Sequence, residues 1–283
     1  MTAAEEGVLL LCCRLGDPNC KPLTLPQFRE LGHRVRAGLS GEDPLRQLQV
    51  SDLTALGYDE GQADGILRLL DRDDQLLDYL HRAEDLDIHP VTRLSPDYPE
   101  AIGRALGFSA PPVLFCRGDL SLLSRPSVAV VGSRHLFPEN EFFARAVGQH
   151  LARTGLTLVS GGAMGADRTV QDTCLAHGGS AVIFVADRLA DHKQEANTLF
   201  LSADGFDVPF SVPRALSRNK LIHIHGQKAL AVQCSHGTGG TWQGCMENLK
   251  HQWSPLYVFN DGSQGSIALI ANGAKPISQP TEI

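Results

Sequence analysis

The sequence lacks the long apolar runs and closely paired cysteines that mark membrane proteins and small disulfide-rich proteins. No apolar run approaches the length of a membrane span, which needs about 18 consecutive apolar residues. Acidic residues precede the apolar patch near the N-terminus, where a signal peptide carries basic ones. The seven cysteines show no C-x-x-C spacing, which favours free thiols in a reducing cytoplasm and argues against a zinc site. We therefore expect a cytoplasmic protein without a metal, a cofactor or a membrane contact.

Common catalytic motifs are also missing. The sequence has no G-x-S-x-G elbow, no P-loop and no H-E-x-x-H motif. His223 and His225 lie two positions apart on a predicted helix, so they do not share a face, and we expect them to be scattered surface residues. These absences predict a binding protein rather than an enzyme.

Carboxylates are unevenly distributed along the chain. Residues 1–90 hold 9 Lys and Arg against 17 Asp and Glu, a net charge of −8, whereas residues 91–283 hold 16 against 15, a net charge of +1. Between Asp207 and Glu247 there is no carboxylate, while the same interval contains Arg214, Arg218 and Lys220. The overall acidity argues against a general nucleic-acid coat but allows one local phosphate-binding face. A chance gap around a buried strand is the alternative.

The hydrophobic pattern predicts three regions. Residues 1–88 read as a small, acidic, all-helical (SAM-like) domain. Residues 89–126 read as a Pro- and Gly-rich linker or extension of short extended pieces and turns that packs on the C-terminal core. Residues 127–283 alternate short β-branched runs with helical stretches, and we assign 193–205 to one of the helices. Apolar strands separated by helices predict an α/β fold with a Rossmann-like, doubly wound parallel sheet.

Loops after the strands are the candidate binding sites, because ligands bind beyond the carboxyl ends of parallel strands. Four of these segments carry glycines, hydroxyls or cations that suit a phosphate. The candidate residues are Gly132, Ser133, Arg134, Gly161, Gly162, Gly165, Asp167, Arg218, Asn219, Lys220, Gly237, Thr238, Gly239, Gly240 and Thr241.

Each segment has a phosphate interpretation and a structural alternative. Arg134 offers a bidentate donor, or is a surface arginine after a structural glycine. The glycines of "SGGAMGAD" bring amides to a helix start, or permit close strand–helix packing. With Ser217 as the N-cap, Arg218 and Lys220 would lie in a first turn, where the helix dipole disfavours cations unless an anion is bound. A solvated basic patch is the alternative there.

An ordered series of motifs links these loops to a known family. The motifs are Asp97-Tyr98-Pro99, Pro111-Pro112 with Leu114, Phe115 and Gly118, then "VAVVGSR", "SGGAMGAD" and "SRNKLI". In this order they resemble the DprA/Smf family of DNA-processing proteins, which is related to the SLOG/LOG superfamily. The resemblance implies a homodimer that binds and protects single-stranded DNA and delivers it to the RecA recombinase in natural transformation. Its DNA-facing candidates are Gly132, Ser133, Arg134, Gly161, Gly165, Arg218, Asn219 and Lys220.

The sequence departs from the family pattern on the ligand face. Met164 stands where the family commonly has arginine, and Lys220 replaces an arginine, which removes a bidentate donor. We expect no C-terminal winged-helix domain. Two alternatives remain open: a DprA-like nucleotide sensor, and a LOG-like phosphoribohydrolase. The latter needs a glutamate three residues after Thr241, where this chain has Gly244, with Glu247 three residues later.

Overall fold

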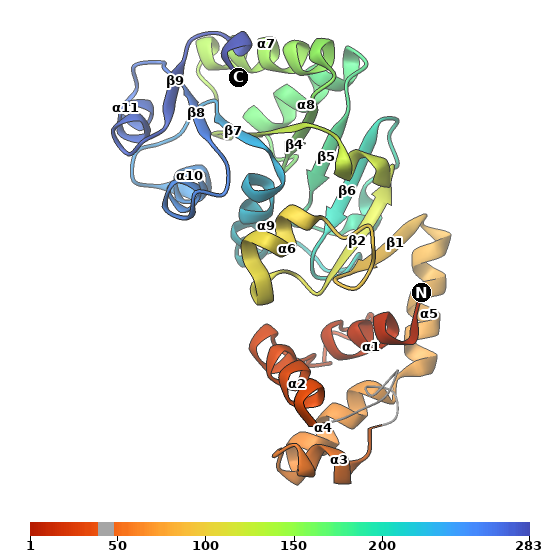
Figure 1. The fold of residues 1–283 in the computed structure, drawn as a ribbon. Coiled ribbons are helices and arrows are strands. Elements are labelled where there is room, and N and C mark those ends of the chain that lie inside the picture. The colour runs from red at the N-terminus through yellow and green to blue at the C-terminus, as the bar shows by residue number, and fades with distance from the viewer. Residues whose placement is uncertain (39–47) are drawn as a thin grey trace.

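The computed structural model describes residues 1–38 and 48–283 and has a nine-stranded sheet at its centre (Figure 1). The strand order is β1-β2-β6-β5-β4-β3-β7-β8-β9. The strands are β1 (Ile88–Thr92), β2 (Val113–Gly118), β3 (Ser127–Val131), β4 (Thr157–Ser160), β5 (Ala181–Phe184), β6 (Thr198–Ser202), β7 (Lys228–Ala231), β8 (Leu256–Phe259) and β9 (Lys275–Ile277). From β6 to β9 the neighbours pair in parallel, while β1 and β2 form an antiparallel edge. The expected α/β, Rossmann-like fold is confirmed.

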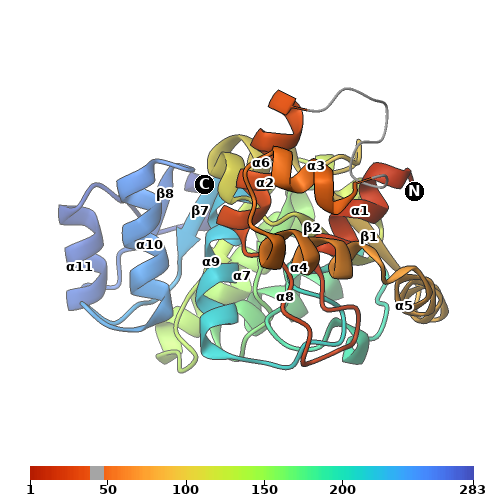
Figure 2. The same ribbon diagram turned by 90° about the horizontal axis from the view of Figure 1, so that it is seen from below.

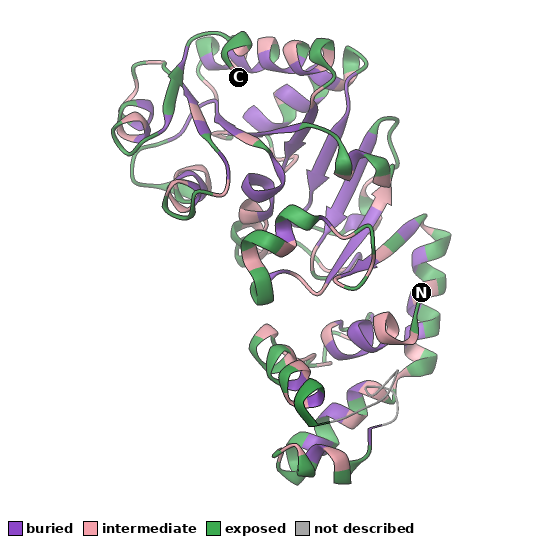
Figure 3. Cartoon of the chain, viewed as in Figure 1, coloured by how far each residue is buried: buried purple, intermediate pink, exposed green. Residues whose placement is uncertain are grey.

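Helices cover both faces of this sheet. The strands β3, β4, β5 and β6 are buried along their whole length, whereas the edge strands β1 and β9 include exposed residues (Figure 3). In β3, Val128 and Val130 join one core cluster and Ala129 and Val131 the other, because successive side chains point to opposite faces. One face carries α7 (Pro138–Thr154) and α8 (Ala166–Ala176). The other carries α6 (Glu100–Leu106), α9 (Val212–His225), α10 (Gly239–His251) and α11 (Gln264–Ala271). Short 3-10 helices are η1 (Gly107–Ser109), η2 (Leu120–Ser124), η3 (Leu189–Asp191) and η4 (Pro280–Glu282).

The N-terminal helices form a small module with its own core, anchored on the sheet. They are α1 (Ala3–Cys12), α2 (Leu25–Gly38), α3 (Val50–Ala55), α4 (Glu60–Leu70) and α5 (Asp73–Asp85). Tyr79 of α5 stacks on Phe206 at 4.3 Å between ring centroids and meets Phe115 of β2 edge-on at 5.9 Å. Its hydroxyl donates to Asp207 Oδ1 at 3.0 Å. The module therefore shares apolar surface with the sheet.

Two segments differ from the sequence prediction. The helix expected over 193–205 is wrong, because residues 198–202 form β6, with all five side chains buried. Phe200 faces one core cluster while Leu199 and Leu201 face the other, so residues 199–201 are all apolar. A short apolar run without alternation cannot be distinguished from a buried helix segment by its sequence pattern. The short extended pieces expected within residues 89–126 include β1 and β2, and the difference is that these two strands extend the sheet. The domain boundaries themselves stay predictions.

Candidate functional site

A cavity lies where the strand order reverses, between β3 and β7. From β3 the chain adds β4, β5 and β6 on one side, whereas β7, β8 and β9 lie on the other. The loops that follow β3 and β7 meet there, and the Ser133 amide donates to the Gln233 carbonyl at 2.9 Å. The cavity between them has a volume of about 340 Å³. Open α/β sheets bind ligands at such a switch point.

Most of the residues predicted from the four segments line this cavity. They are Gly132, Ser133, Arg134, Asp167, Arg218, Asn219, Thr238, Gly239, Gly240 and Thr241. The other predicted residues lie outside its lining and are Gly161, Gly162, Gly165, Lys220 and Gly237. Phe210 also lines the cavity, is 53% exposed and was not among the predicted residues. An aromatic residue between Pro209 and Pro213, in a chain with few aromatics, was the available signal.

Asp167 organises the glycine loop that precedes α8. Its Oδ2 accepts hydrogen bonds from the amides of Gly161 at 3.2 Å and Ala163 at 3.4 Å. Burial raises the pKa of Asp167, against the opposing effects of Arg218 and these two amides. The Asp167 carboxylate thus binds two loop amides that the sequence pattern suggested as phosphate ligands. Their direct contact with a ligand stays a prediction.

Arg218 lies against the same loop. Its Nη1 donates to the Phe184 carbonyl at 2.7 Å, while its buried Nε has no hydrogen-bond partner in the part of the chain that the structure describes. A Cβ on Gly161 would lie 1.7 Å from Nη1, so glycine is required for this approach. Burial lowers the pKa of Arg218 and Asp167 raises it, but a guanidinium stays charged in either case. The cavity wall therefore carries a cation with an unused donor.

Arg134 supplies a second cation at the rim. Gly165, with φ +85°, lets the loop after β4 close onto the loop after β3, because a Cβ there would lie 2.3 Å from the Ser133 carbonyl. The Ala166 amide donates to that carbonyl at 3.1 Å. Arg134 is exposed and forms no ion pair with any residue in 1–38 or 48–283. Its charge is available to a ligand.

The start of α10 completes the cavity. Its N-cap, Thr238, makes no side-chain capping bond, so no hydroxyl covers the first amides of this 13-residue helix. Thr241 instead donates its hydroxyl to the Gly132 carbonyl at 3.0 Å and ties α10 to the loop after β3. Exposed amides at a helix N-terminus favour an anion.

The predicted start of α9 is wrong. The helix begins at Val212, and the Ser211 hydroxyl accepts from the Arg214 amide at 3.3 Å, so Ser217 is not the N-cap. Pro213 in the first turn was the overlooked cue. Arg218 lies beyond the first turn of α9, so its position is not disfavoured by the helix dipole and does not by itself indicate a bound anion. It reaches the cavity because its helix packs across the sheet.

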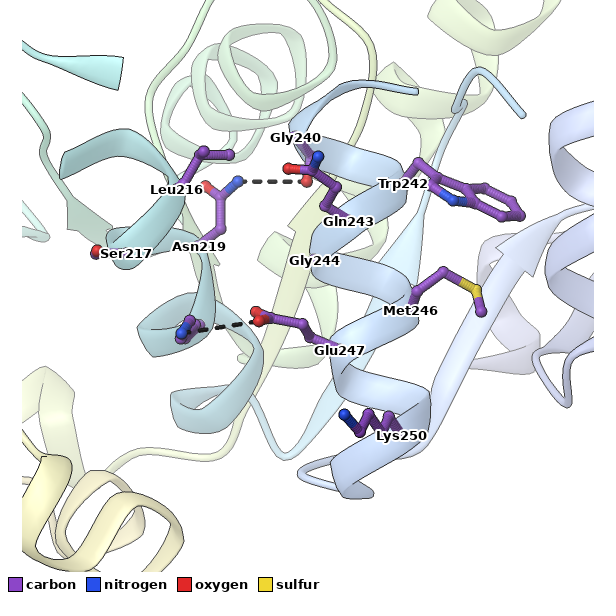
Figure 4. Close-up of a pocket in the computed structure, with 11 residues that line it drawn as sticks. Leu216, Ser217, Asn219, Gly240, Trp242, Gln243, Gly244, Met246, Glu247 and Lys250 are labelled. Carbon is purple, nitrogen blue, oxygen red and sulfur yellow. Dashed lines mark hydrogen bonds and ion pairs between the residues drawn. The ribbon is translucent and has the colours of Figure 1, made fainter. Parts of the chain in front are cut away.

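A separate pocket of about 530 Å³ lies between α9 and α10 (Figure 4), two helices that are neighbours in Figure 2. Lys220 is one of its lining residues. Its Nζ is 3.7 Å from Glu247 Oε1. Glu247 points toward α9 in this pocket and does not line the switch-point cavity. Gly244 packs against α9, because a Cβ there would lie 3.1 Å from His223 Nε2. A LOG-like glutamate is therefore not positioned at the cavity.

The prediction that His223 and His225 are surface residues is wrong. Their side chains are 1% and 7% exposed, since α9 is covered by the sheet and by α10. Burial lowers the pKa of each imidazole to about 4. Both are neutral in the folded protein at neutral pH.

Comparison with known proteins agrees with this architecture. Residues 89–283 match the family model described as DNA recombination-mediator protein A. The chain belongs to this family. It is 29% identical to the protein Smf of Escherichia coli over 190 residues, which cover 61% of this chain and 50% of that protein. It is 28% identical to the DNA processing protein DprA of Streptococcus pneumoniae over 224 residues, 73% of this chain and 77% of that protein. The chain thus spans about half the length of the E. coli relative.

Solved structures of family members share the fold. The DprA structure from S. pneumoniae superposes with a TM-score of 0.74 at 22% identity and covers 100% of this chain and 96% of that one. DprA from Helicobacter pylori, whose structure concerns single-stranded DNA binding, superposes with a TM-score of 0.59 at 24% identity and covers 69% and 93%. Within residues 1–38 and 48–283, no helix is long and apolar enough to span a membrane.

Proposed function

We propose that this protein is a non-enzymatic binding protein for single-stranded DNA, which it holds at the switch-point cavity. The observation that carries the proposal is the convergence of Arg134, Arg218 and the start of α10 on one cavity. Single strands bind to cationic grooves that follow phosphates, with aromatic side chains for the bases. Phe210 is the exposed aromatic side chain at this cavity.

The wider role rests on the family. We propose that the protein protects DNA and loads RecA onto it during natural transformation, as a cytoplasmic homodimer. This role is supported by membership of the family described as DNA recombination-mediator protein A. The relative from S. pneumoniae is named for DNA processing, and the H. pylori structure is described by its single-stranded DNA binding.

The test is binding of fluorescent oligo-dT, followed by anisotropy at several salt concentrations. Wild-type protein should bind with an affinity that falls as salt rises. Arg134→Ala should weaken binding roughly tenfold, the effect of one lost charge-assisted phosphate contact, and should reduce the salt slope by about 0.7. Arg153→Ala is the matched control, because Arg153 is exposed at the opposite end of the sheet.

Two outcomes would refute the binding of single-stranded DNA, and a third would refute the absence of catalysis. One is absence of binding, or binding that does not respond to salt. The other is full competition by a single nucleotide together with no gain in affinity on lengthening the oligonucleotide, which would instead support a nucleotide sensor. Release of free base from nucleoside monophosphates would indicate an enzyme.

A further inference from the structure

A larger cavity adjoins the switch-point cavity and lies between the N-terminal module and the sheet domain. Its volume is about 840 Å³. One wall comes from the module, with residues 12–14 and 22–25. The opposite wall comes from α9 and the segments before it, and residues 111–113 also line the cavity. Phe210 and Arg218 line both cavities, so the two are adjacent. We call the larger one the interdomain cleft.

Positive charge exceeds negative charge among the lining residues of the interdomain cleft. Asp204 is the one carboxylate among its described lining residues, and Arg214 Nε contacts it at 2.8 Å. The remaining lining cations are Arg14, Arg218 and Lys220. Lys220 pairs with Glu247 of α10 at 3.7 Å, and this ion pair is weak because both side chains are partly exposed to water. The cleft is therefore suited to an anion.

Arg14 is the module's contribution to this charge. It is exposed and forms no ion pair within the described ranges, although residues 1–90 carry a net charge of −8. An acidic module would repel a nucleic acid over most of its surface. The residues that the N-terminal module contributes to the cleft, however, include Arg14 and no carboxylate. The charge of the module is locally reversed where it faces α9.

Apolar side chains accompany these cations. Phe210 lines both cavities, and Pro22, Leu25 and Pro111 also line the cleft. A surface with both cationic and apolar side chains suits a single strand, whose phosphates and bases need both. A folded acidic partner would not reach into a recess between two parts of one chain.

We propose that single-stranded DNA leaves the switch-point cavity past Phe210 and continues through the interdomain cleft, where Arg14 contacts a phosphate. This inference rests on the proposed function and extends it. It assigns the N-terminal module a part in binding DNA, so that the strand is held between the two parts of the chain.

The test is the dependence of affinity on strand length. Oligo-dT between about 4 and about 16 nucleotides, the span of typical single-strand sites, is titrated into wild type, Arg14→Ala, Arg14→Lys and Arg36→Ala. Arg36 is the matched control, an exposed arginine of the same module that does not line the cleft. Arg14 is exposed, and equal thermal midpoints will show that its replacement leaves the fold intact.

The expected result depends on length. Arg14→Ala should match wild type on the shortest strands, which fill only the switch-point cavity. It should bind the longest strands roughly tenfold more weakly, with a salt slope lower by about 0.7, as expected for one lost phosphate contact. Arg14→Lys should recover most of the affinity, and Arg36→Ala should behave as wild type.

The outcomes separate this inference from the proposed function. If wild type binds and Arg134→Ala weakens binding, but Arg14→Ala equals wild type at every length, the cleft is not the path and the function stands. The cleft inference also fails if Arg36→Ala weakens long strands as much as Arg14→Ala, because the effect is then one of general charge. Absence of binding by wild type at every length overturns both.

Discussion

Acidification should destabilise this protein through the two buried histidines of α9. The pKa of both His223 and His225 is lowered by burial from 6.5 to about 4, so each imidazole stays neutral in the folded chain. In the unfolded chain each would bind a proton below about pH 6.5. The unfolded state therefore binds more protons, and the free energy of unfolding falls as the pH drops from 6.5 toward 4. Below about pH 4 these two residues add no further loss.

The size of the effect follows from the two pKa values. At pH 5, protonation of an unfolded imidazole favours unfolding by about 2 kcal/mol, while the folded imidazole is still mostly neutral. The pair thus contributes about 4 kcal/mol between pH 7.5 and pH 5. This is a large part of the 5 to 15 kcal/mol that stabilises an ordinary protein. Most unfolded carboxylates remain ionised at pH 5, so they contribute little in this window.

Urea unfolding at a series of pH values, for wild type and His225→Leu, measures this effect. Neither ring nitrogen of His225 has a hydrogen-bond partner in the part of the chain that is described, so leucine removes two unpaired polar atoms as well as the titration. The variant should be at least as stable as wild type at pH 7.5 and should lose about 2 kcal/mol less on going to pH 5. His81→Gln, at an exposed position, is the control and should follow wild type.

Equal pH dependence in wild type and His225→Leu would refute the reasoning. It would mean that His225 finds a partner or water in the folded state, or that the unfolded chain keeps it buried. A stability that is flat from pH 7.5 to pH 5 in wild type would refute it for both histidines.

Two further substitutions test contacts of the glycine loop and of Tyr79. Gly161→Ala places a Cβ 1.7 Å from Arg218 Nη1, so it should displace the guanidinium and reduce oligo-dT affinity about as much as Arg218→Ala, and unchanged anisotropy curves would contradict this. Tyr79→Phe removes the hydroxyl that donates to Asp207 and accepts from the Phe206 amide, and urea unfolding should show a loss of about 1 kcal/mol. A variant as stable as wild type would mean that water replaces the hydroxyl.

The parallel strands were predictable where each is a β-branched run buried on both faces. Residues 127–131 and 157–160 have this pattern, and the structure places strands there. At the antiparallel edge only short extended pieces were expected, and not strands of the sheet, because β1 and β2 include or follow prolines, such as Pro90 and Pro112, that interrupt the pattern. Strand β6 was missed because polar residues precede it and its apolar run has no alternation.

The candidate site was predictable only as a set of loops. Carboxyl ends of neighbouring parallel strands meet at one edge, which is why loops far apart in sequence line one cavity. Which side chains enter the cavity depends on contacts that no spacing encodes. Phe210 enters from a segment without strand or helix. Lys220 lies two positions after Arg218 on α9, on a different face of the helix, and lines the pocket between α9 and α10 instead.

The glycine loop before α8 changes where an anion should bind in this cavity. Gly161 and Gly165 are each required by a close contact, with a guanidinium in one case and a carbonyl in the other. The buried carboxylate of Asp167 already accepts from two amides of the loop, so a phosphate placed there would meet a like charge. In the part of the chain that the structure describes, no carboxylate pairs with Arg134 and no side chain caps the start of α10. We therefore expect a bound phosphate on the α10 side of the cavity, with Arg218 between it and Asp167.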